Sequence, residues 1–243
     1  TEAGAGSDAA ACRTTAVRDG DEYVINGTKC FITNSTYAEI FVVFASTNRE
    51  AGVKGLSAFI VERNRPGFSV DKHEDKMGIR TSDTASLVFD NVRIPADHLL
   101  GKEGEGFKYA MQTLDLARPF VGASAVGLAQ RAVDEAVKYA KERICFGKPI
   151  AKLQAIQFML ADMEIGVETA RQMVIHTLQL AEAHQPYSKE AAVAKCYAGD
   201  VAFKVAGDAV QIFGGYGYSR EYPVEKLLRD SKVLQIYGGT NQV

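Results

Sequence analysis

Two segments with helical periodicity meet at Gln211-Ile-Phe-Gly-Gly-Tyr-Gly-Tyr-Ser-Arg-Glu-Tyr-Pro-Val-Glu-Lys-Leu-Leu-Arg-Asp230. Three glycines stand here between the apolar end of one helix-like run and the charged start of the next. Because glycine has no Cβ, such a turn brings backbone N–H groups close to a large ligand. The later charges Glu221, Lys226 and Asp230 make the pattern more specific. The stretch therefore predicts a ligand-contacting turn between two helices.

The chain has helical periodicity from Phe107 onward. Apolar residues recur every three or four positions over 125–139, 156–174 and 191–212, and the third run is rich in alanine. Two long helices are expected to end at Phe146-Gly147 and near His184-Gln-Pro186, and a short fourth helix is expected over Pro223–Gln235. Short connections between helices favour antiparallel neighbours, so this half predicts an antiparallel four-helix-type bundle.

Residues 1–100 have the alternating pattern of β-strands. Gly, Pro, Asn and Asp separate these runs, which favours an antiparallel barrel or sandwich. The strand candidates are Cys12–Arg18, Glu22–Ile25, Thr28–Thr33, Ile40–Ser46, Leu56–Glu62 and Ser86–Ile94. The predicted fold class is therefore α+β with more than one domain, namely an antiparallel β barrel or sandwich over 1–100 followed by a helical bundle over 101–243.

The composition excludes several functional classes. A net charge of −2 and a pI near 6.1 carry no footprint of nucleic-acid binding. No apolar run reaches the length of about 18 residues that a membrane helix needs. The four cysteines have neither metal-ligand spacing nor the density of a disulfide scaffold, so no metal site is predicted.

The opening Thr1-Glu-Ala-Gly-Ala-Gly-Ser-Asp8 and the glycine-rich stretch 211–230 resemble, in the same order, two signatures of the acyl-CoA dehydrogenases. This family consists of flavoproteins that use FAD to introduce an α,β double bond into acyl-CoA thioesters. The rival interpretation of Gly4-Ala-Gly6 is a dinucleotide-binding turn, which requires a following helix, whereas a strand pattern follows here.

The resemblance covers essentially the whole chain and is closest to straight-chain, short- to medium-chain members. It implies an oxidoreductase of fatty acid metabolism and β-oxidation that passes electrons to an electron-transfer flavoprotein. It also implies that the chain is the middle β domain and most of the C-terminal helical domain, without the family's N-terminal helical domain and C-terminal tail. The expected location is the cytoplasm of a bacterium or the mitochondrial matrix of a eukaryote.

The resemblance further implies a set of FAD contacts. Thr1, Phe31 and Thr33 correspond to positions at the flavin ring, and Ser7 to a pyrophosphate contact. The segment from Arg143 to Gln154 and the 211–215 turn correspond to contacts with the FAD of a neighbouring subunit, so a homo-oligomer, usually a tetramer, is expected. The full set is Thr1, Ser7, Phe31, Thr33, Arg143, Phe146, Gln154, Gln211, Gly214, Gly215, Thr240 and Gln242.

On the residues alone, some of these positions have simpler interpretations. Phe31 is then a core strand residue, and Arg143 caps the end of a helix. Asp115 and Arg118 form an i, i+3 pair beside Pro119, which is an intrahelical ion pair on this view. The resemblance instead places Asp115, Arg118 and Tyr237 on the acyl-CoA substrate side.

The carboxylate that accepts the Cα proton in this family is missing. Gly238 stands where most members have that glutamate, and Ala117 stands at the position that supplies it in some others. Three explanations are open: an engineered or incidental Glu-to-Gly change at 238, another carboxylate such as Asp115 or one on the absent N-terminal domain, or binding of flavin and acyl-CoA without catalysis. Two alternative functions are therefore open. The first is a relative that lacks the base and only binds flavin and acyl-CoA. The second is a family member that uses another acid/base and acts on cyclic or aryl acyl-CoA, or in the reductive direction.

Overall fold

The computed structural model describes residues 1–243, which fall into two units. Thr1–Lys76 and Arg80–Thr113 form the first, here called the β unit. Met77–Ile79 and Leu114–Val243 form the second, here called the helical unit. None of the helices combines the length and apolarity needed to cross a lipid bilayer.

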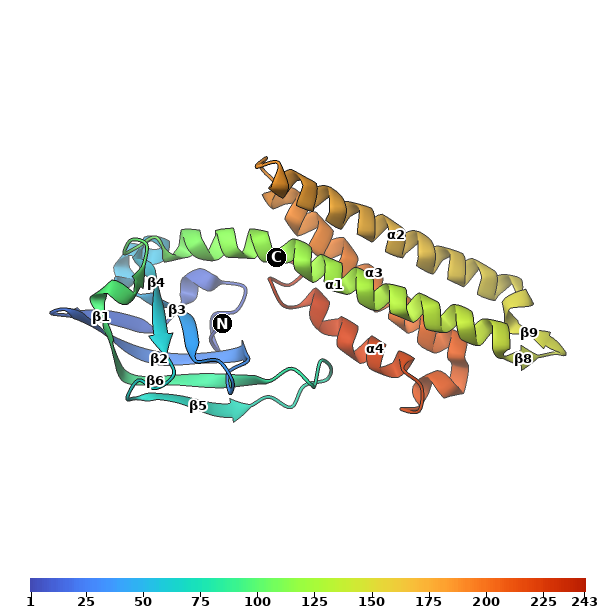
Figure 1. Ribbon diagram of the computed structural model, residues 1–243, viewed down its shortest axis with the longest axis horizontal. Helices are drawn as coiled ribbons and strands as arrows, with labels where there is room; N and C mark the ends of the chain where they lie inside the picture. The colour runs from blue at the N-terminus through green and yellow to red at the C-terminus, as the bar shows by residue number, and fades with distance from the viewer. The chain divides into compact units, whose positions relative to one another are not determined.

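The β unit is built on one seven-stranded sheet in the order β5-β6-β2-β1-β3-β4-β7 (Figure 1). All neighbours pair antiparallel except β1 and β3, which meet in parallel at Thr15 and Ser46. The strands are β1 (Thr15–Asp19), β2 (Glu22–Thr33), β3 (Ile40–Ser46), β4 (Leu56–Glu62), β5 (Phe68–His73), β6 (Thr84–Pro95) and β7 (Leu99–Leu100).

The sheet curls around its own apolar face. The rings of Phe41 on β3 and Phe68 on β5 lie 5.0 Å apart, although the two strands are four places apart in the sheet order. In a flat sheet four places correspond to about 19 Å. The core enclosed by this curl includes Tyr23, Ile25, Phe59, Val61 and Ile94. The predicted β domain is confirmed, as a single curled sheet that is antiparallel except for the β1–β3 pair.

The first strand begins at Thr15 and not at Cys12, the two-residue β7 was not predicted, and two larger differences follow. Glu22–Ile25 and Thr28–Thr33 are one strand, because Gly27 (φ 150°) lies at a register shift that bends β2 without ending it. Strand β5 was not predicted, since its charged end, Asp71-Lys72-His73, hides the alternation of Phe68 and Val70. It lies at the edge of the sheet, where charged residues are tolerated.

The helical unit contains three long helices and one short one. They are α1 (Gly106–Glu142), whose first residues belong to the β unit, α2 (Gln154–Glu182), α3 (Ser188–Phe213) and α4 (Val224–Ser231). Alanines of α1 and α3 contribute strongly to one buried cluster with Met163 and Val167 of α2. Small side chains let helix axes approach closely, which is why the alanine-rich periodicity encodes a tight bundle. The predicted helical bundle is confirmed.

The end of α1 was predicted four residues too late. The helix stops at Glu142, and β8 (Ile144–Cys145) and β9 (Lys148–Pro149) form a small hairpin. Phe146 (φ 53°) and Gly147 (φ 75°) both have positive φ, as a two-residue hairpin turn of type I′ requires. The apolar residues after Glu142 belong to this hairpin, whose tip leaves the Phe146 side chain 90% exposed.

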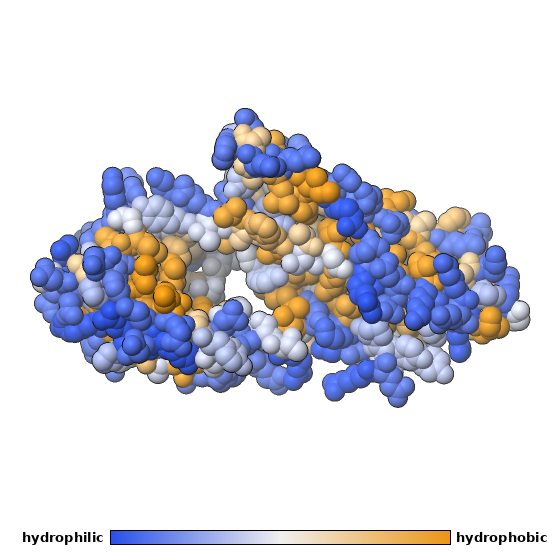
Figure 2. All heavy atoms as spheres, viewed as in Figure 1, coloured by the Kyte–Doolittle hydropathy of each residue, from blue (hydrophilic) through white to orange (hydrophobic).

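Both units keep apolar side chains at the surface, as the orange areas in Figure 2 show. On the helical unit they include Phe158 and Ile165 of α2. On the β unit they include Ile40 and Val42 of β3.

Candidate functional site

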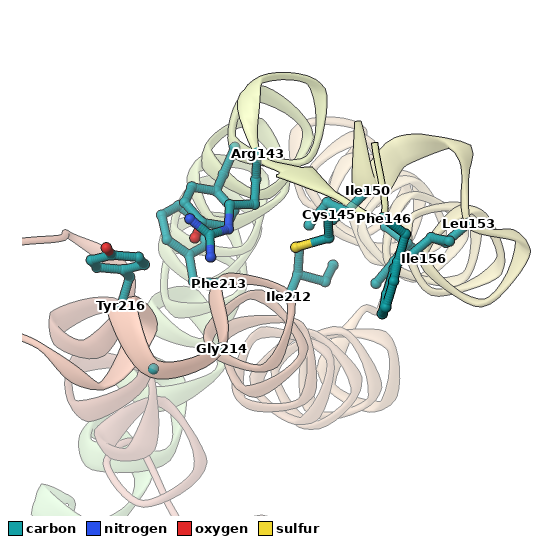
Figure 3. Close-up of a pocket in the computed structure, with 12 residues that line it drawn as sticks. Arg143, Cys145, Phe146, Ile150, Leu153, Ile156, Ile212, Phe213, Gly214 and Tyr216 are labelled. Atoms are coloured by element: carbon teal, nitrogen blue, oxygen red, sulfur yellow. The ribbon is translucent and has the colours of Figure 1, made fainter. Parts of the chain in front are cut away.

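The helical unit has a cavity of about 590 Å³ at the end of the bundle that carries the β8–β9 hairpin. Figure 3 shows Arg143, Phe213 and Tyr216 at one end of it and Phe146, Leu153 and Ile156 at the other. The lining residues are Tyr139, Arg143, Cys145, Phe146, Ile150, Leu153, Ile156, Ile212, Phe213, Gly214, Gly215 and Tyr216. Segments that are about 70 positions apart in the sequence thus meet at one site.

Aromatic rings form one wall of this cavity. The rings of Tyr139 on α1 and Phe213 on α3 stack at 4.0 Å with 14° between their planes. The Arg143 guanidinium lies over the Tyr216 ring, 5.5 Å from its centre. Flat rings beside an exposed guanidinium suit a ligand with a planar group and an anionic group.

The glycine-rich turn exposes backbone to the same cavity. Helix α3 ends at Phe213, and Gly214 (φ 62°) starts the 3₁₀ turn Gly214–Tyr218. A Cβ added at Gly214 or Gly215 would meet no atom within 4 Å, so both positions are open. Four residues assigned to FAD by the resemblance, Arg143, Phe146, Gly214 and Gly215, therefore converge on one cavity. Gln211 and Gln154 are exposed and do not line it.

The β unit brings Thr1 and the Phe31 segment together. The Cys30 N–H donates to the Thr1 carbonyl over 3.0 Å. Phe31 has φ 56° and lies in a register shift between Lys29 and Ile32 of β2, so its ring points out of the core and is 62% exposed. Bulges of this kind often redirect a side chain toward a ligand. The interpretation of Phe31 as a core residue is wrong.

The remaining β-unit residues of the predicted FAD set lie at the surface. Thr33 and Ser7 are exposed. Gly4 belongs to a tight turn closed by the Glu2–Ala5 bridge, and Gly6 directly follows this turn; a 3₁₀ turn (Ala9–Ala11) and then strand β1 come next. A dinucleotide-binding turn requires a long helix at this point, so that interpretation is wrong.

Sequence reasoning overlooked Glu2, which organises the first loop. Its carboxylate is buried and accepts from Lys29 Nζ (2.7 Å), Thr14 Oγ1 (2.6 Å) and the N–H groups of Thr14 (3.0 Å) and Arg13 (2.7 Å). Burial alone raises the pKa of this carboxyl, but the hydrogen bonds from Lys29, Thr14 and Arg13 outweigh burial and lower it. An ionised Glu2 thus ties the Thr1 loop to β2. No sequence pattern identified Glu2, because the burial of Lys29, whose ammonium group needs a partner, is seen only in the structure.

A second turn of the helical unit contains Gly238, the position at which the resemblance predicts the family's base. Gly238 (φ 70°) and Gly239 (φ 95°) are both left-handed, and Arg118 Nε on α1 donates to the Gly238 carbonyl over 3.3 Å. Arg118 Nη1 also lies 3.2 Å from Asp115 Oδ1. Ala117 directly precedes Arg118 on α1, and neither Ala117 nor Gly238 provides a carboxylate.

The other residues predicted near this turn differ in exposure. Tyr237 is 44% exposed, and burial of its hydroxyl raises the pKa of Tyr237. Thr240 is half-buried and Gln242 is exposed. Sequence reasoning also overlooked the buried Lys195, whose Nζ donates to the Gly239 carbonyl over 2.6 Å.

Two protein-family models match the chain. The model described as the acyl-CoA dehydrogenase middle domain matches residues 1–92, and the one described as the acyl-CoA dehydrogenase C-terminal domain matches residues 104–243.

Three similar proteins have all of this chain aligned to them. Butyryl-CoA dehydrogenase from Megasphaera elsdenii is 50% identical, with a TM-score of 0.98 and 63% of its chain covered. A chain from the solved structure described as the electron transferring flavoprotein of Acidaminococcus fermentans is 55% identical, with a TM-score of 0.98 and 64% covered. Acryloyl-CoA reductase (NADH) from Anaerotignum propionicum is 51% identical over 245 residues, with 62% covered.

The chain spans about 64% of the length of the curated relatives that it matches. Both of its units correspond to domains of one family, in the same order along the chain. The chain therefore belongs to the acyl-CoA dehydrogenase family.

Proposed function

We propose that the protein containing this chain binds FAD and oxidises the α,β bond of a straight-chain acyl-CoA thioester. The observation that carries the proposal is the convergence of Arg143, Phe146, Gly214 and Gly215 on one cavity with stacked aromatic walls. These residues fit FAD, because a guanidinium and open backbone suit a pyrophosphate and flat rings suit an adenine. On the β unit, the outward-facing Phe31 and the nearby Thr1 are suited to the flavin ring.

Bound FAD would supply the acceptor for the hydride that leaves the β carbon of the acyl group. Among the chain's own residues, Arg118 holds the Gly238 carbonyl and so fixes the turn at the position of the base. Asp115 holds Arg118 in turn. Proton removal from the α carbon requires a positioned base, and such a group contributes a factor of about 10² to 10⁴ in rate. Gly238 and Ala117 provide none, so the proposal predicts intact ligand binding and impaired turnover.

The experiment is an anaerobic titration of the full-length, flavin-loaded protein with butyryl-CoA, following the absorbance of oxidised flavin. For the unaltered protein, which has Gly238, a spectral shift on binding and only slow bleaching are expected. In Gly238→Glu, bleaching should become about 10² to 10⁴ times faster. The added Cβ would meet no atom within 4 Å, so the strain of the left-handed backbone, about 1–2 kcal/mol, is the main structural penalty.

Gly52→Glu is the matched control. Gly52 (φ 56°) also has positive φ with open space around its Cβ position, but it lies in the 3₁₀ segment Arg49–Gly55, which contains none of the predicted site residues. It should leave the flavin response unchanged. Bleaching of the unaltered protein as fast as that of Gly238→Glu would show that a base exists elsewhere, and Asp115→Asn would then test the first candidate. Absence of bleaching by butyryl-CoA in every variant, Gly238→Glu included, would refute the proposed function.

Two alternatives remain within the same family. The 51% identity to a protein named acryloyl-CoA reductase supports the reductive direction, in which another acid would deliver the proton to the α carbon, because Gly238 and Ala117 provide none. Reoxidation of dithionite-reduced flavin by crotonyl-CoA would identify this activity. The other alternative is a protein that binds flavin and acyl-CoA without catalysis. In that case both butyryl-CoA and crotonyl-CoA should shift the flavin spectrum, and neither should exchange electrons with the flavin.

The proposal includes partners. Transfer of electrons to an electron-transfer flavoprotein is supported by the likeness to the Acidaminococcus fermentans structure. Sharing of FAD between subunits of a homotetramer is supported by the Phe146 side chain, which is 90% exposed beside the cavity. The proposal also places the protein in the cytoplasm of a bacterium, and not in the mitochondrial matrix, because the relatives named above are bacterial.

A further inference from the structure

The Gly238–Gly239 turn is held by two cationic side chains from two different helices. Arg118 of α1 binds the carbonyl of Gly238 over 3.3 Å, and Lys195 of α3 binds the carbonyl of Gly239 over 2.6 Å. Both glycines have positive φ. Glycine is the residue with the most backbone freedom, so two adjacent glycines need outside contacts to keep one conformation.

Lys195 is unusual for a residue in a helix core. It is only 3% exposed, and no carboxylate lies within ion-pair distance of its ammonium group. Its hydrogen-bond acceptors are the Gly239 carbonyl and, at 2.8 Å, Asn241 Oδ1. Burial lowers the pKa of Lys195. An apolar residue of similar volume at a buried position is often neutral or stabilising, so core packing alone does not account for this lysine.

The charge of Lys195 is connected to a carboxylate through the side chain of Asn241. Asn241 Oδ1 accepts from Lys195, and its Nδ2 donates to Asp200 Oδ1 over 2.8 Å and to the Cys196 carbonyl over 3.1 Å. Gln235 Nε2 donates to the same Asp200 oxygen over 2.6 Å. The amide can satisfy all of these partners in one orientation only. The network therefore binds both ends of the 236–241 turn to α3.

The buried side chains around Lys195 on α3 are small and apolar, so the hydrogen-bond network is confined to this one place on the helix. The neighbouring buried positions one helical turn away, Ala191 and Ala198, are small and apolar, as is Ala194. Gly199 lies so close to the turn that an added Cβ would come 2.9 Å from the Leu234 carbonyl. The small residues on this face of α3 thus leave room for the backbone of the 236–241 turn, and Lys195 is the charged group that contacts this backbone.

We propose that Lys195 is a positioning residue that fixes the Gly238–Gly239 turn, and thereby the direction in which position 238 presents its substituent toward the acyl-CoA. The link to acyl-CoA rests on the proposed function. The anchoring itself does not, which allows the two to be tested separately.

The first test measures hydrogen exchange in the full-length, flavin-loaded protein. In Lys195→Met, amides in 236–243 should exchange about 10 to 100 times faster, because hydrogen bonds to a charged group are lost, while amides of α2 stay within about twofold. Asn241→Leu should have the same local effect, and the double variant should not exceed the stronger single one. Lys204→Met is the matched control, since Lys204 is an exposed lysine of the same helix, and it should change neither region.

The second test separates positioning from packing. In the Gly238→Glu background, Lys195→Met should slow flavin bleaching by butyryl-CoA at least about tenfold while the half-saturating concentration changes less than about threefold, and Lys195→Arg should restore part of the rate. Unchanged exchange in 236–243, or equal acceleration throughout α2, would overturn the proposal. If Lys195→Met does not fold, Asn241→Leu decides by the same criteria. If butyryl-CoA does not bleach the flavin of Gly238→Glu, the proposed function is refuted. The hydrogen-exchange data still test whether Lys195 anchors the turn.

Discussion

Replacing Glu2 by glutamine should destabilise the first loop of the β unit far more than the same replacement at a surface glutamate. The Glu2 carboxylate accepts from Lys29, Thr14 and Arg13 at 2.6–3.0 Å, and the Glu2 and Lys29 side chains are only 8% and 9% exposed. Glutamine keeps one acceptor oxygen, but its NH₂ group meets donors where the second oxygen stood. Removing one partner of a buried ion pair typically costs about 3–5 kcal/mol, and we expect about 3 kcal/mol here.

The assay is native-state hydrogen exchange at the amides of Arg13 and Thr14. A loss of about 3 kcal/mol corresponds to local opening that is about 100 times more frequent. Glu62→Gln is the matched control. Glu62 accepts two hydrogen bonds of 2.8 Å from Arg65, which lower its pKa to about 2, yet its side chain is 33% exposed. An exposed pair contributes about 0–1 kcal/mol, so exchange near Glu62 should change by less than about fivefold.

The pH dependence supplies a second check on the Glu2 prediction. Because the pKa of Glu2 is lower in the folded chain than its unfolded value of 4.5, its contribution to stability is complete above pH 4.5 and is lost as pH falls toward the folded value. The difference between the natural chain and Glu2→Gln should therefore shrink below about pH 4.5. A difference that stays constant down to pH 3.5, or one no larger than that of Glu62→Gln, would refute the reasoning.

Other substitutions test the bundle and its cavity. Gly199→Ala should lower the free energy of unfolding by about 1–3 kcal/mol, because its Cβ would come 2.9 Å from the Leu234 carbonyl, whereas Gly207→Ala on the same helix has no atom closer than 4.0 Å and should raise it by about 0.5–1 kcal/mol. Urea titrations of both variants measure this, and equal effects would contradict the packing argument. Arg143→Ala should weaken FAD retention about tenfold and reduce the oligomer together, as absorbance-detected gel filtration would show. Normal flavin content would exclude Arg143 as a contact.

The sequence predicted most of the secondary structure because periodicity is a local property. Strands Ile40–Ser46 and Leu56–Glu62 have the predicted bounds, and their apolar runs lie between clear turn residues. The end of α1 was missed because Ile144, Cys145 and Phe146 continue an apolar pattern after the helix. Only the positive φ at Phe146 and Gly147, which an apolar pattern does not reveal, makes a hairpin there.

For the same reason, the sequence predicted the candidate site only in part. The motifs named Arg143, Phe146, Gly214 and Gly215 separately, and the family resemblance made them FAD contacts. Their meeting around one cavity with the Tyr139–Phe213 stack depends on the packing of α1 against α3, which brings together residues about 70 positions apart.

By itself, the sequence determined the β-then-α order, the family and the absence of a carboxylate at Gly238 and Ala117, because each of these depends on residue identity at a known position. Tertiary structure alone decided that Phe31 faces outward from a bulge and that Glu2 and Lys29 form a buried pair. It also decided that Lys195 reaches the backbone of Gly239. The physical reason is that burial and hydrogen-bond partners are set by chain segments that are distant in sequence, and no local pattern records which segments will meet.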